Sequence, residues 1–131
     1  MKLLLVDDDE AARLSLRQAI ELKTTFEVVG EASDGLEALR LVQELEVDIV
    51  LMDVRMPVMD GAQATTLIKQ YKPDVYILAI SESADPAAVS GMLRAGASGY
   101  VLKAALPEIF LSPLEAASSG HRVRPIEPLP Y

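Results

Sequence analysis

The chain has 131 residues, a net charge of −8 and no cysteine, and 50% of its residues are hydrophobic. This length and balance are typical of one soluble globular domain with its own core. The acidic charge argues against direct binding to nucleic acid or to an anionic membrane, and the lack of cysteine excludes disulfides and thiolate sites. No apolar run approaches the roughly 18 residues of a membrane span, and the N-terminal residues lack a signal-peptide pattern. We therefore expect a cytoplasmic domain without membrane contact.

The first third of the chain alternates apolar runs with stretches of helical periodicity. Residues 2–6 predict a buried strand, which the acidic residues 7–10 end. Apolar positions then recur at helical spacing over residues 11–22. A second, shorter strand is expected over residues 26–30, followed by a helix over residues 33–45.

Two helix starts carry capping signals. Asp9 is expected to cap the first helix. Asp34 and Glu37 have the spacing of a capping box, in which each side chain accepts a hydrogen bond from the backbone N–H of the other residue. The apolar face expected for this second helix consists of Leu36, Ala38, Leu39, Val42 and Leu45.

The middle of the chain contains the most informative apolar run. Residues 48–52 end abruptly in the carboxylate of Asp53, which predicts a strand buried on both faces with an acid at its carboxyl end. A loop of turn residues leads to a helix over residues 61–71. The next strand is expected over residues 75–80 and stops at Ser81.

The C-terminal third adds another helix and strand. Asp85 followed by proline predicts a helix start, and Gly96 is a natural helix stop. Residues 99–102 form the last expected strand, which ends at Lys103. A final helix is expected over residues 107–120.

Proline marks the end of the folded part. Pro113 should kink the final helix or delay its start, because proline lacks the N–H that a helix interior needs. Residues 121–131 contain three prolines and have the composition of an extended linker. We therefore expect one domain over residues 1–120 and a proline-rich tail or linker over residues 121–131.

The five successive strand–helix units predict an α/β fold. Such alternation produces a doubly wound, five-stranded parallel sheet with helices on both faces and right-handed crossovers. In open sheets of this kind, ligands and chemistry gather at the carboxyl edge of the strands. The expected strands deliver five polar residues to this edge, namely Asp7, Asp8, Asp53, Ser81 and Lys103.

Each of these residues has an ordinary structural explanation when taken singly, as a helix cap, a strand end or a surface charge. Taken together they do not, because crowded carboxylates repel by about a few kcal/mol per pair at an effective dielectric near 20. A divalent cation offsets that repulsion, and an all-oxygen ligand set favours Mg²⁺, or Mn²⁺ by the same logic. Lys103 and Ser81 suit phosphoryl oxygens, which leaves Asp53 as the carboxylate that attacks phosphorus.

Four segments, LLLVDDDE, DIVLMDVRMPVMDG, YILAIS and GASGYVLKA, resemble the receiver domain of bacterial two-component response regulators. The resemblance covers about residues 2–120, and the last segment looks most like receivers joined to a LuxR-type (NarL/FixJ) helix-turn-helix. It implies a flavodoxin-like fold with the strand order 2-1-3-4-5. It also implies a signalling switch that catalyses only its own phosphorylation and dephosphorylation and is not otherwise an enzyme.

The resemblance implies which residues bind a metal ion. It implies that Asp53 is the phosphoacceptor, that Asp8 and Asp53 bind Mg²⁺ directly, and that the backbone carbonyl of Arg55 is a third ligand. Asp7 would act mainly through water. Mg²⁺ is therefore the implied cofactor, with Mn²⁺ as a substitute.

The resemblance also assigns phosphoryl-binding and switch residues, and partners. Ser81 and Lys103 would hold the phosphoryl group, and Ser81 would act with Tyr100, the aromatic switch residue. The implied partners are a sensor histidine kinase and an output domain or protein, such as one that controls transcription. A second copy of the chain is a further partner, in a dimer formed on phosphorylation; no direct contact of this segment with nucleic acid is implied.

Two other interpretations remain open at this stage. Asp7-x-Asp9 has the nucleophile spacing of haloacid-dehalogenase phosphatases, with Ser81 and Lys103 as phosphate-binding residues, although no acidic pair follows Lys103. The place where phosphate becomes attached, Asp53 or Asp7, separates the two readings. The third interpretation is a pseudo-receiver used only for protein contacts, which the full acidic set disfavours.

A separate hypothesis concerns the side chain of Arg55. It lies two residues after Asp53, beside the mouth of the expected site. A long guanidinium there can occupy the path of the water that hydrolyses the aspartyl-phosphate. The alternative is an ordinary surface ion pair, with Glu82 as the suggested partner.

Overall fold

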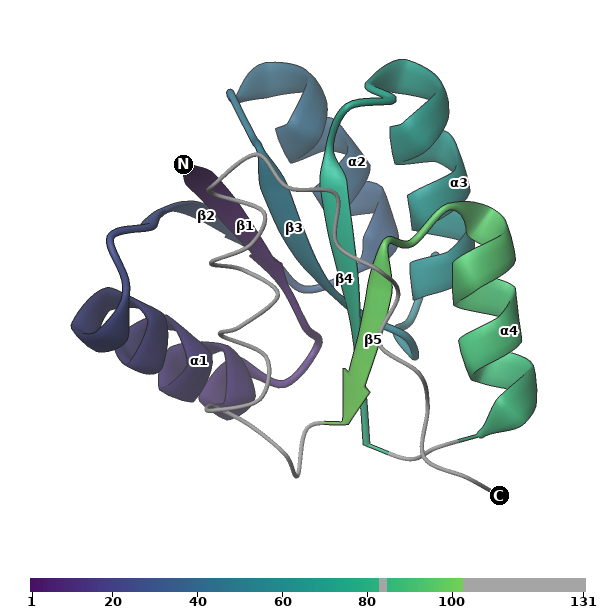
Figure 1. Ribbon diagram of the computed structural model, residues 1–131, viewed down its shortest axis with the longest axis horizontal. Coiled ribbons are helices and arrows are strands. Elements are labelled where there is room, and N and C mark those ends of the chain that lie inside the picture. The colour runs from purple at the N-terminus through teal and green to yellow at the C-terminus, as the bar shows by residue number, and fades with distance from the viewer. Residues whose placement is uncertain (83–84, 103–131) are drawn as a thin grey trace.

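A five-stranded parallel sheet with the order β2-β1-β3-β4-β5 forms the centre of the computed structural model (Figure 1). The structure describes residues 1–82 and 85–102, except for the side chain of residue 23. The strands are β1 (Lys2–Val6), β2 (Glu27–Ala32), β3 (Ile49–Asp53), β4 (Tyr76–Ser81) and β5 (Gly99–Leu102). The helices are α1 (Glu10–Lys23), α2 (Gly35–Glu44), α3 (Gly61–Tyr71) and α4 (Pro86–Ala95).

The sheet confirms the predicted doubly wound arrangement and its strand order 2-1-3-4-5. Figure 1 shows α1 on one face of the sheet and α2, α3 and α4 on the other. Every residue of β3 is buried, as expected of a strand covered on both faces. The predicted final helix over residues 107–120, Pro113, the tail over residues 121–131 and Lys103 lie outside the described residues.

Side chains of alternate strand residues build two hydrophobic layers, because successive residues of a strand point to opposite faces. The layer beneath α2, α3 and α4 includes Leu4, Val6, Val50, Met52, Ile77, Ala79 and Tyr100. The layer beneath α1 includes Leu3, Leu5, Leu16, Ile20, Ile49, Leu51, Leu78 and Ile80. Among the described helices, none has the length and hydrophobicity needed to cross a bilayer.

Strand β2 begins and ends later than the predicted range of residues 26–30. It pairs Leu3 with Val28 but Leu4 with Gly30, so that a bulge shifts the register within the β1–β2 ladder. The ladder then continues to Ala32, past the charged residue Glu31. Glu31 can remain in the strand because its carboxylate is held by ion pairs with two arginines of α1.

Strands β3 and β4 each extend one residue beyond their predicted ends. Asp53 pairs with Ile80, and Ser81 pairs with Leu102, so both polar residues belong to the sheet ladder. The polar side chains therefore sit on the last strand residues. Their backbones are fixed by the sheet.

The predicted buried face of α2 is only partly correct. Ala38 and Val42 are buried, whereas Leu36 is 52% exposed and Leu45 is 37% exposed. Leu39 is partly buried and packs against the core. The start of the helix is also buried at Gly35, whose N–H donates to the carbonyl of Met59 at 3.0 Å, so the buried positions of α2 are Gly35, Ala38 and Val42.

The predicted helix caps are confirmed, with one change of partner. Asp9 accepts hydrogen bonds at the start of α1, and Asp34 accepts one from the N–H of Glu37 at 2.8 Å. The Glu37 carboxylate, however, accepts from the N–H of Ser33 at 3.1 Å, so the bond back to Asp34 that a capping box requires is replaced. Gly96 ends α4 with a φ of 115°, a left-handed conformation that glycine adopts readily.

Candidate functional site

Three carboxylates meet where β1 and β3 end. The two strands are direct neighbours in the sheet, with Val6 opposite Met52. Asp7 and Asp8 follow β1, and Asp53 is the last residue of β3. One carboxylate oxygen from each of the three lies within 4.8 Å of the others. The parallel pairing of β1 and β3 therefore creates the acidic site.

The exposure of the three acids differs. Asp7 is 3% exposed and Asp53 is 5% exposed, whereas Asp8 is exposed to solvent. Two unit charges 4 Å apart repel by about 4 kcal/mol at an effective dielectric of 20, and burial limits how well water can screen the pair. Carboxylate oxygens at this spacing are a ligand set that suits Mg²⁺ or Mn²⁺. The residues present thus fit a hard divalent cation.

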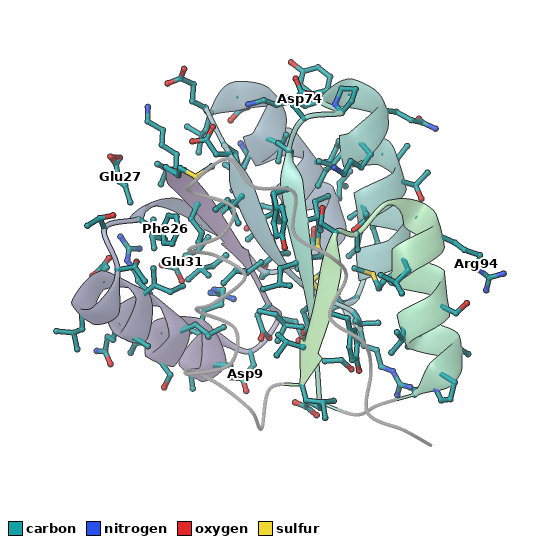
Figure 2. All side chains as sticks on the ribbon, viewed as in Figure 1. Asp9, Phe26, Glu27, Glu31, Asp74 and Arg94 are labelled. Carbon is teal, nitrogen blue, oxygen red and sulfur yellow. The ribbon has the colours of Figure 1, made fainter. Side chains whose placement is uncertain are left out.

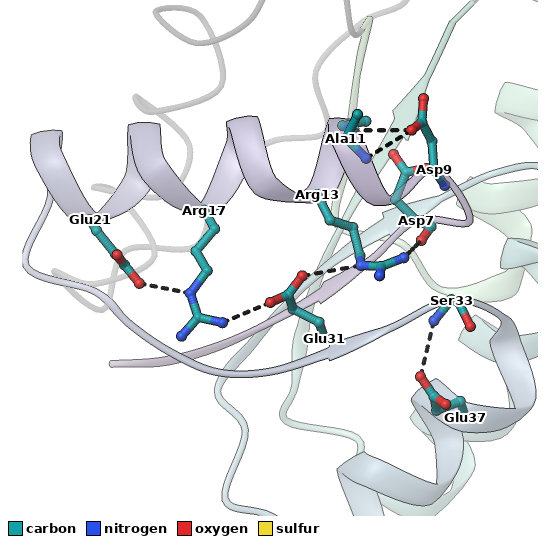
Figure 3. Close-up of polar contacts among 10 residues, drawn as sticks. Asp7, Asp9, Ala11, Arg13, Arg17, Glu21, Glu31, Ser33 and Glu37 are labelled. Carbon is teal, nitrogen blue, oxygen red and sulfur yellow. Dashed lines mark hydrogen bonds and ion pairs between the residues drawn. The ribbon is translucent and has the colours of Figure 1, made fainter.

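Hydrogen bonds fix Asp7 at three of its polar atoms. Its backbone N–H donates to the carbonyl of Ala32 at 3.0 Å, which ties it to the end of β2. Its Oδ1 accepts from the N–H of Asp9 at 2.9 Å. Its backbone carbonyl accepts from Nη1 of Arg13 at 2.6 Å (Figure 3). The corner where β1 turns into α1 is therefore held by both backbone and side chains.

A chain of charged side chains runs from this corner along the side of α1 that faces β2 (Figure 3). Glu31 of β2 accepts from Nε of Arg13 at 3.1 Å and from Nη1 of Arg17 at 2.7 Å (Figure 3). Arg17 also donates to Glu21 at 2.9 Å. The hydrogen bond from Arg17 is the main cause that lowers the pKa of Glu31, with a smaller contribution from Arg13, while partial burial opposes both. No local sequence pattern predicts this network, because residues 13 and 31 are neighbours only in the fold.

Two predicted residues lie on the strands that follow β3 in the sheet, Ser81 on the adjacent strand β4 and Tyr100 one strand further on β5. Ser81 ends β4 and is 5% exposed, on the strand that neighbours Asp53. Tyr100 of β5 is 1% exposed and packs in the layer beneath α2, α3 and α4. Lys103 follows β5 directly in the sequence but lies outside the described residues.

Arg55 lies in the loop after β3. Its side chain is 73% exposed, and Nη2 donates to Oδ2 of Asp85 at 2.9 Å. The structure therefore pairs it with Asp85, whereas the sequence suggested Glu82. Asp85 is also the N-cap of α4, since Oδ1 accepts from the N–H of Ala87 at 3.1 Å. The ion pair thus spans the loops that follow β3 and β4.

The sequence from residue 3 to residue 113 matches the family model described as the response regulator receiver domain. The chain belongs to this receiver domain family. The match confirms the resemblance seen in the motifs and the flavodoxin-like fold expected from it. Receiver domains bind Mg²⁺ at an acidic pocket, and in this receiver Asp7, Asp8 and Asp53 form such a cluster.

Curated relatives of this receiver are transcriptional regulatory proteins. It is 36% identical to Transcriptional regulatory protein LnrK of Bacillus subtilis over 127 residues, which covers 97% of the chain and 58% of LnrK. It is 38% identical to LiaR of the same organism over 120 residues, which covers 92% of the chain and 57% of LiaR. The chain therefore spans little more than half the length of these relatives.

Solved structures give the same result. A LuxR-family two-component response regulator from Aurantimonas sp. SI85-9A1 superposes with a TM-score of 0.85 at 37% identity, covering 92% of this receiver and 86% of that chain. The isolated REC domain of RcsB from Salmonella enterica serovar Typhimurium, determined with the phosphomimetic BeF3−, superposes with a TM-score of 0.84 at 26% identity. That comparison covers 95% of this receiver and 93% of the RcsB domain. The expected likeness to LuxR-type regulators is thus confirmed.

Proposed function

We propose that this receiver domain is a phosphorylatable signalling switch, in which Asp53 accepts a phosphoryl group from a phosphohistidine of a sensor kinase. The observation that carries the proposal is the position of Asp53. It is buried, it ends the central strand, and one of its oxygens lies within 4.8 Å of oxygens of Asp7 and Asp8. A carboxylate in this setting is a fixed nucleophile beside a site for a divalent cation.

The transfer exchanges one bond for another. An oxygen of Asp53 forms a bond to phosphorus while the bond from phosphorus to the kinase imidazole nitrogen breaks, and the electron pair leaves with the imidazole. Asp8, Asp53 and the carbonyl of Arg55 would hold Mg²⁺, with Asp7 acting through water. When bound, Mg²⁺ would neutralise the charge that gathers on the transferring phosphoryl group. Ser81 and Lys103 would hold its remaining oxygens.

The proposed chemistry belongs to the domain itself. The domain would phosphorylate and dephosphorylate only its own Asp53 and would turn over no separate substrate. The match to the receiver model over residues 3–113 speaks against the haloacid-dehalogenase interpretation, in which Asp7 would be the nucleophile. The complete set of three acids speaks against a pseudo-receiver.

The output of the switch would lie on the face formed by α4, β5 and the helix expected over residues 107–120, which lies outside the described residues. A phosphoryl group on Asp53 would draw the hydroxyl of Ser81 toward it and favour the inward position of Tyr100. The fold accommodates Tyr100 in that position, since the side chain is 1% exposed here. Phosphate would then shift a two-state equilibrium by the difference in its affinity for the two states.

The proposed partners are a sensor histidine kinase and an output domain that regulates transcription. The longer relatives, of which the chain spans little more than half, are named as transcriptional regulators, which supports the second partner. The net charge of −8 supports a role in which this segment leaves DNA contact to another domain. A dimer formed on phosphorylation and a cytoplasmic location belong to the same proposal.

Phosphorylation with a small acyl phosphate tests the proposal directly. Intact-mass measurements should show one added phosphoryl group with Mg²⁺ present and none after chelation. Asp53→Ala should accept none, while Asp7→Ala should be impaired but retain some transfer. Phosphate recovered on Asp7 by peptide mapping would overturn the proposal in favour of the phosphatase.

A further inference from the structure

The side chain of Arg13 connects the acidic site with the neighbouring strand β2. Its Nη1 donates to the backbone carbonyl of Asp7 at 2.6 Å, and its Nε donates to Glu31 at 3.1 Å. The two bonds use different nitrogens of one planar guanidinium, so the group is held from two sides. The Arg13 side chain is only 15% exposed, which limits competition from water.

The carbonyl of Asp7 that accepts the hydrogen bond from Arg13 belongs to the peptide that joins Asp7 to Asp8. This one peptide therefore links two acids of the site. A peptide is planar, so fixing its carbonyl oxygen also fixes the N–H and the start of the next residue. The directions in which both carboxylates leave the backbone depend on this plane. A bond from Arg13 to this carbonyl therefore constrains two of the three acids at once.

We propose that Arg13 is a positioning residue for the Mg²⁺ site, held in place by Glu31, and that it sets cation affinity through the Asp7–Asp8 peptide. This inference rests on the proposed function, in which the acidic site binds Mg²⁺. Arg13 donates hydrogen bonds only and touches neither the cation nor the phosphoryl group.

Geometry and charge predict opposite results when Arg13 is replaced. A positive guanidinium beside the site repels a divalent cation, so its removal on charge alone should strengthen Mg²⁺ binding. If Arg13 acts by holding the peptide, its removal should weaken binding, because outer hydrogen bonds orient metal ligands. The sign of the change in Mg²⁺ affinity therefore distinguishes the two roles.

Arg17 provides a matched control. It binds the same Glu31 carboxylate, at 2.7 Å, from the same helix. The Arg17 guanidinium pairs with Glu31 and Glu21, and neither of these is an acid of the site. Arg17→Met should therefore reduce stability through the shared network, as Arg13→Met does, without changing the Asp7–Asp8 peptide.

The experiment is a Mg²⁺ titration of the folded chain, followed by amide NMR shifts, with the free energy of unfolding measured separately. Arg13→Met should weaken Mg²⁺ affinity roughly tenfold, as loss of an outer hydrogen bond does at metal sites. Arg13→Lys should weaken Mg²⁺ affinity similarly, because lysine keeps the positive charge but lacks the planar guanidinium that donates from two nitrogens. Glu31→Gln should give a smaller loss in the same direction, and Arg17→Met should leave the affinity unchanged.

Phosphorylation by acetyl phosphate supplies a second readout. The rate in Arg13→Met should fall at low Mg²⁺ and return to the wild-type value at saturating Mg²⁺. Unchanged or tighter Mg²⁺ binding in Arg13→Met, or an equal loss in Arg17→Met, would overturn the positioning role. A wild-type chain that binds no Mg²⁺ would instead overturn the proposed function itself, so the two failures are separable.

Discussion

The guanidinium of Arg55 lies 2.9 Å from the carboxylate of Asp85 and so joins the loop after β3 to the N-terminus of α4. Both side chains are at least one-third exposed, at 73% and 36%. Exposed ion pairs of this kind contribute about 0–1 kcal/mol. A phosphoryl group on Asp53 can therefore compete with Asp85 for the same guanidinium.

This competition predicts the lifetime of the aspartyl-phosphate. Arg55→Ala should shorten the half-life with little change in the rate of phosphorylation, because the guanidinium no longer obstructs the attacking water. Asp85→Asn should lengthen the half-life, because asparagine still caps α4 but holds Arg55 less strongly. The half-lives of the wild type, Arg55→Ala and Asp85→Asn should be measured at equal Mg²⁺. Equal half-lives would show that Arg55 forms only a surface ion pair.

Mg²⁺ should stabilise the folded chain. Binding at a concentration of about 100 times Kd contributes roughly 2.7 kcal/mol to the free energy of unfolding. Thermal melts with and without Mg²⁺ should separate for the wild type and coincide for Asp8→Ala. Asp74→Ala is the control: this exposed acid lies at the end of the molecule opposite Asp9 (Figure 2), so its melts should separate as in the wild type.

Glu31 should make stability depend on pH. Its pKa is lowered in the folded state, chiefly by the hydrogen bond from Arg17. The stabilisation is therefore fully present above the unfolded-state pKa and is lost as pH falls through the lower, folded-state value. Relative to Glu31→Gln, the wild type should be more stable by about 1 kcal/mol at pH 7, and this advantage should disappear in acid.

Urea unfolding over a series of pH values measures the Glu31 effect. Arg17→Met should reduce the pH-dependent difference, because it removes the largest cause of the lowered pKa. In the Arg17→Met background, Glu31→Gln should then have a smaller effect. A wild-type advantage that persists unchanged in acid would contradict the assignment to the Glu31 carboxylate.

Ser81 should transmit phosphorylation to Tyr100. With Ser81→Ala, Asp53 should still accept phosphate, but the amide shifts around Tyr100 should respond less than in the wild type. The reason is that the missing hydroxyl can no longer move toward the phosphoryl group. Equal shifts around Tyr100 in the two proteins would show that the coupling follows another route.

Two glycines should respond oppositely to alanine. A Cβ at Gly61 would lie 2.3 Å from the backbone oxygen of Asp53, so Gly61→Ala must displace the phosphoacceptor strand or α3 and should lose both stability and phosphorylation. A Cβ at Gly91 would meet no atom within 4 Å. Gly91→Ala should stabilise α4 by about 0.5–1 kcal/mol. Comparable unfolding midpoints for the two variants would contradict this contrast.

The sequence was sufficient for features that depend on local order. Apolar runs that end in Asp53 and Ser81 predicted the polar edge of the sheet, because a parallel strand buried on both faces has a nearly continuous apolar pattern. Asp9, Asp85 and Gly96 predicted helix ends, because caps act within one turn.

The sequence was insufficient where distant residues decide the result. Leu36 and Leu45 of the predicted α2 face are exposed, whereas Gly35 is buried at its contact with the distant Met59 carbonyl. Glu31 remained within β2 because arginines of α1 neutralise it, and neither partner is adjacent in the chain. The role of Arg13 at the Asp7 carbonyl depends on the same tertiary contact.

The pairing of β1 with β3 has a consequence for the chain before its folding is complete. Asp8 and Asp53 are separated in sequence by α1, β2 and α2, and only the finished crossover brings them together. Such non-local contacts are slow to form, because the chain must first lose the entropy of closing a long loop. A nascent or unfolded chain has the same aspartates but not their arrangement, so we expect it to accept no phosphoryl group. Under the proposed function, only chains that have completed folding would respond to a kinase.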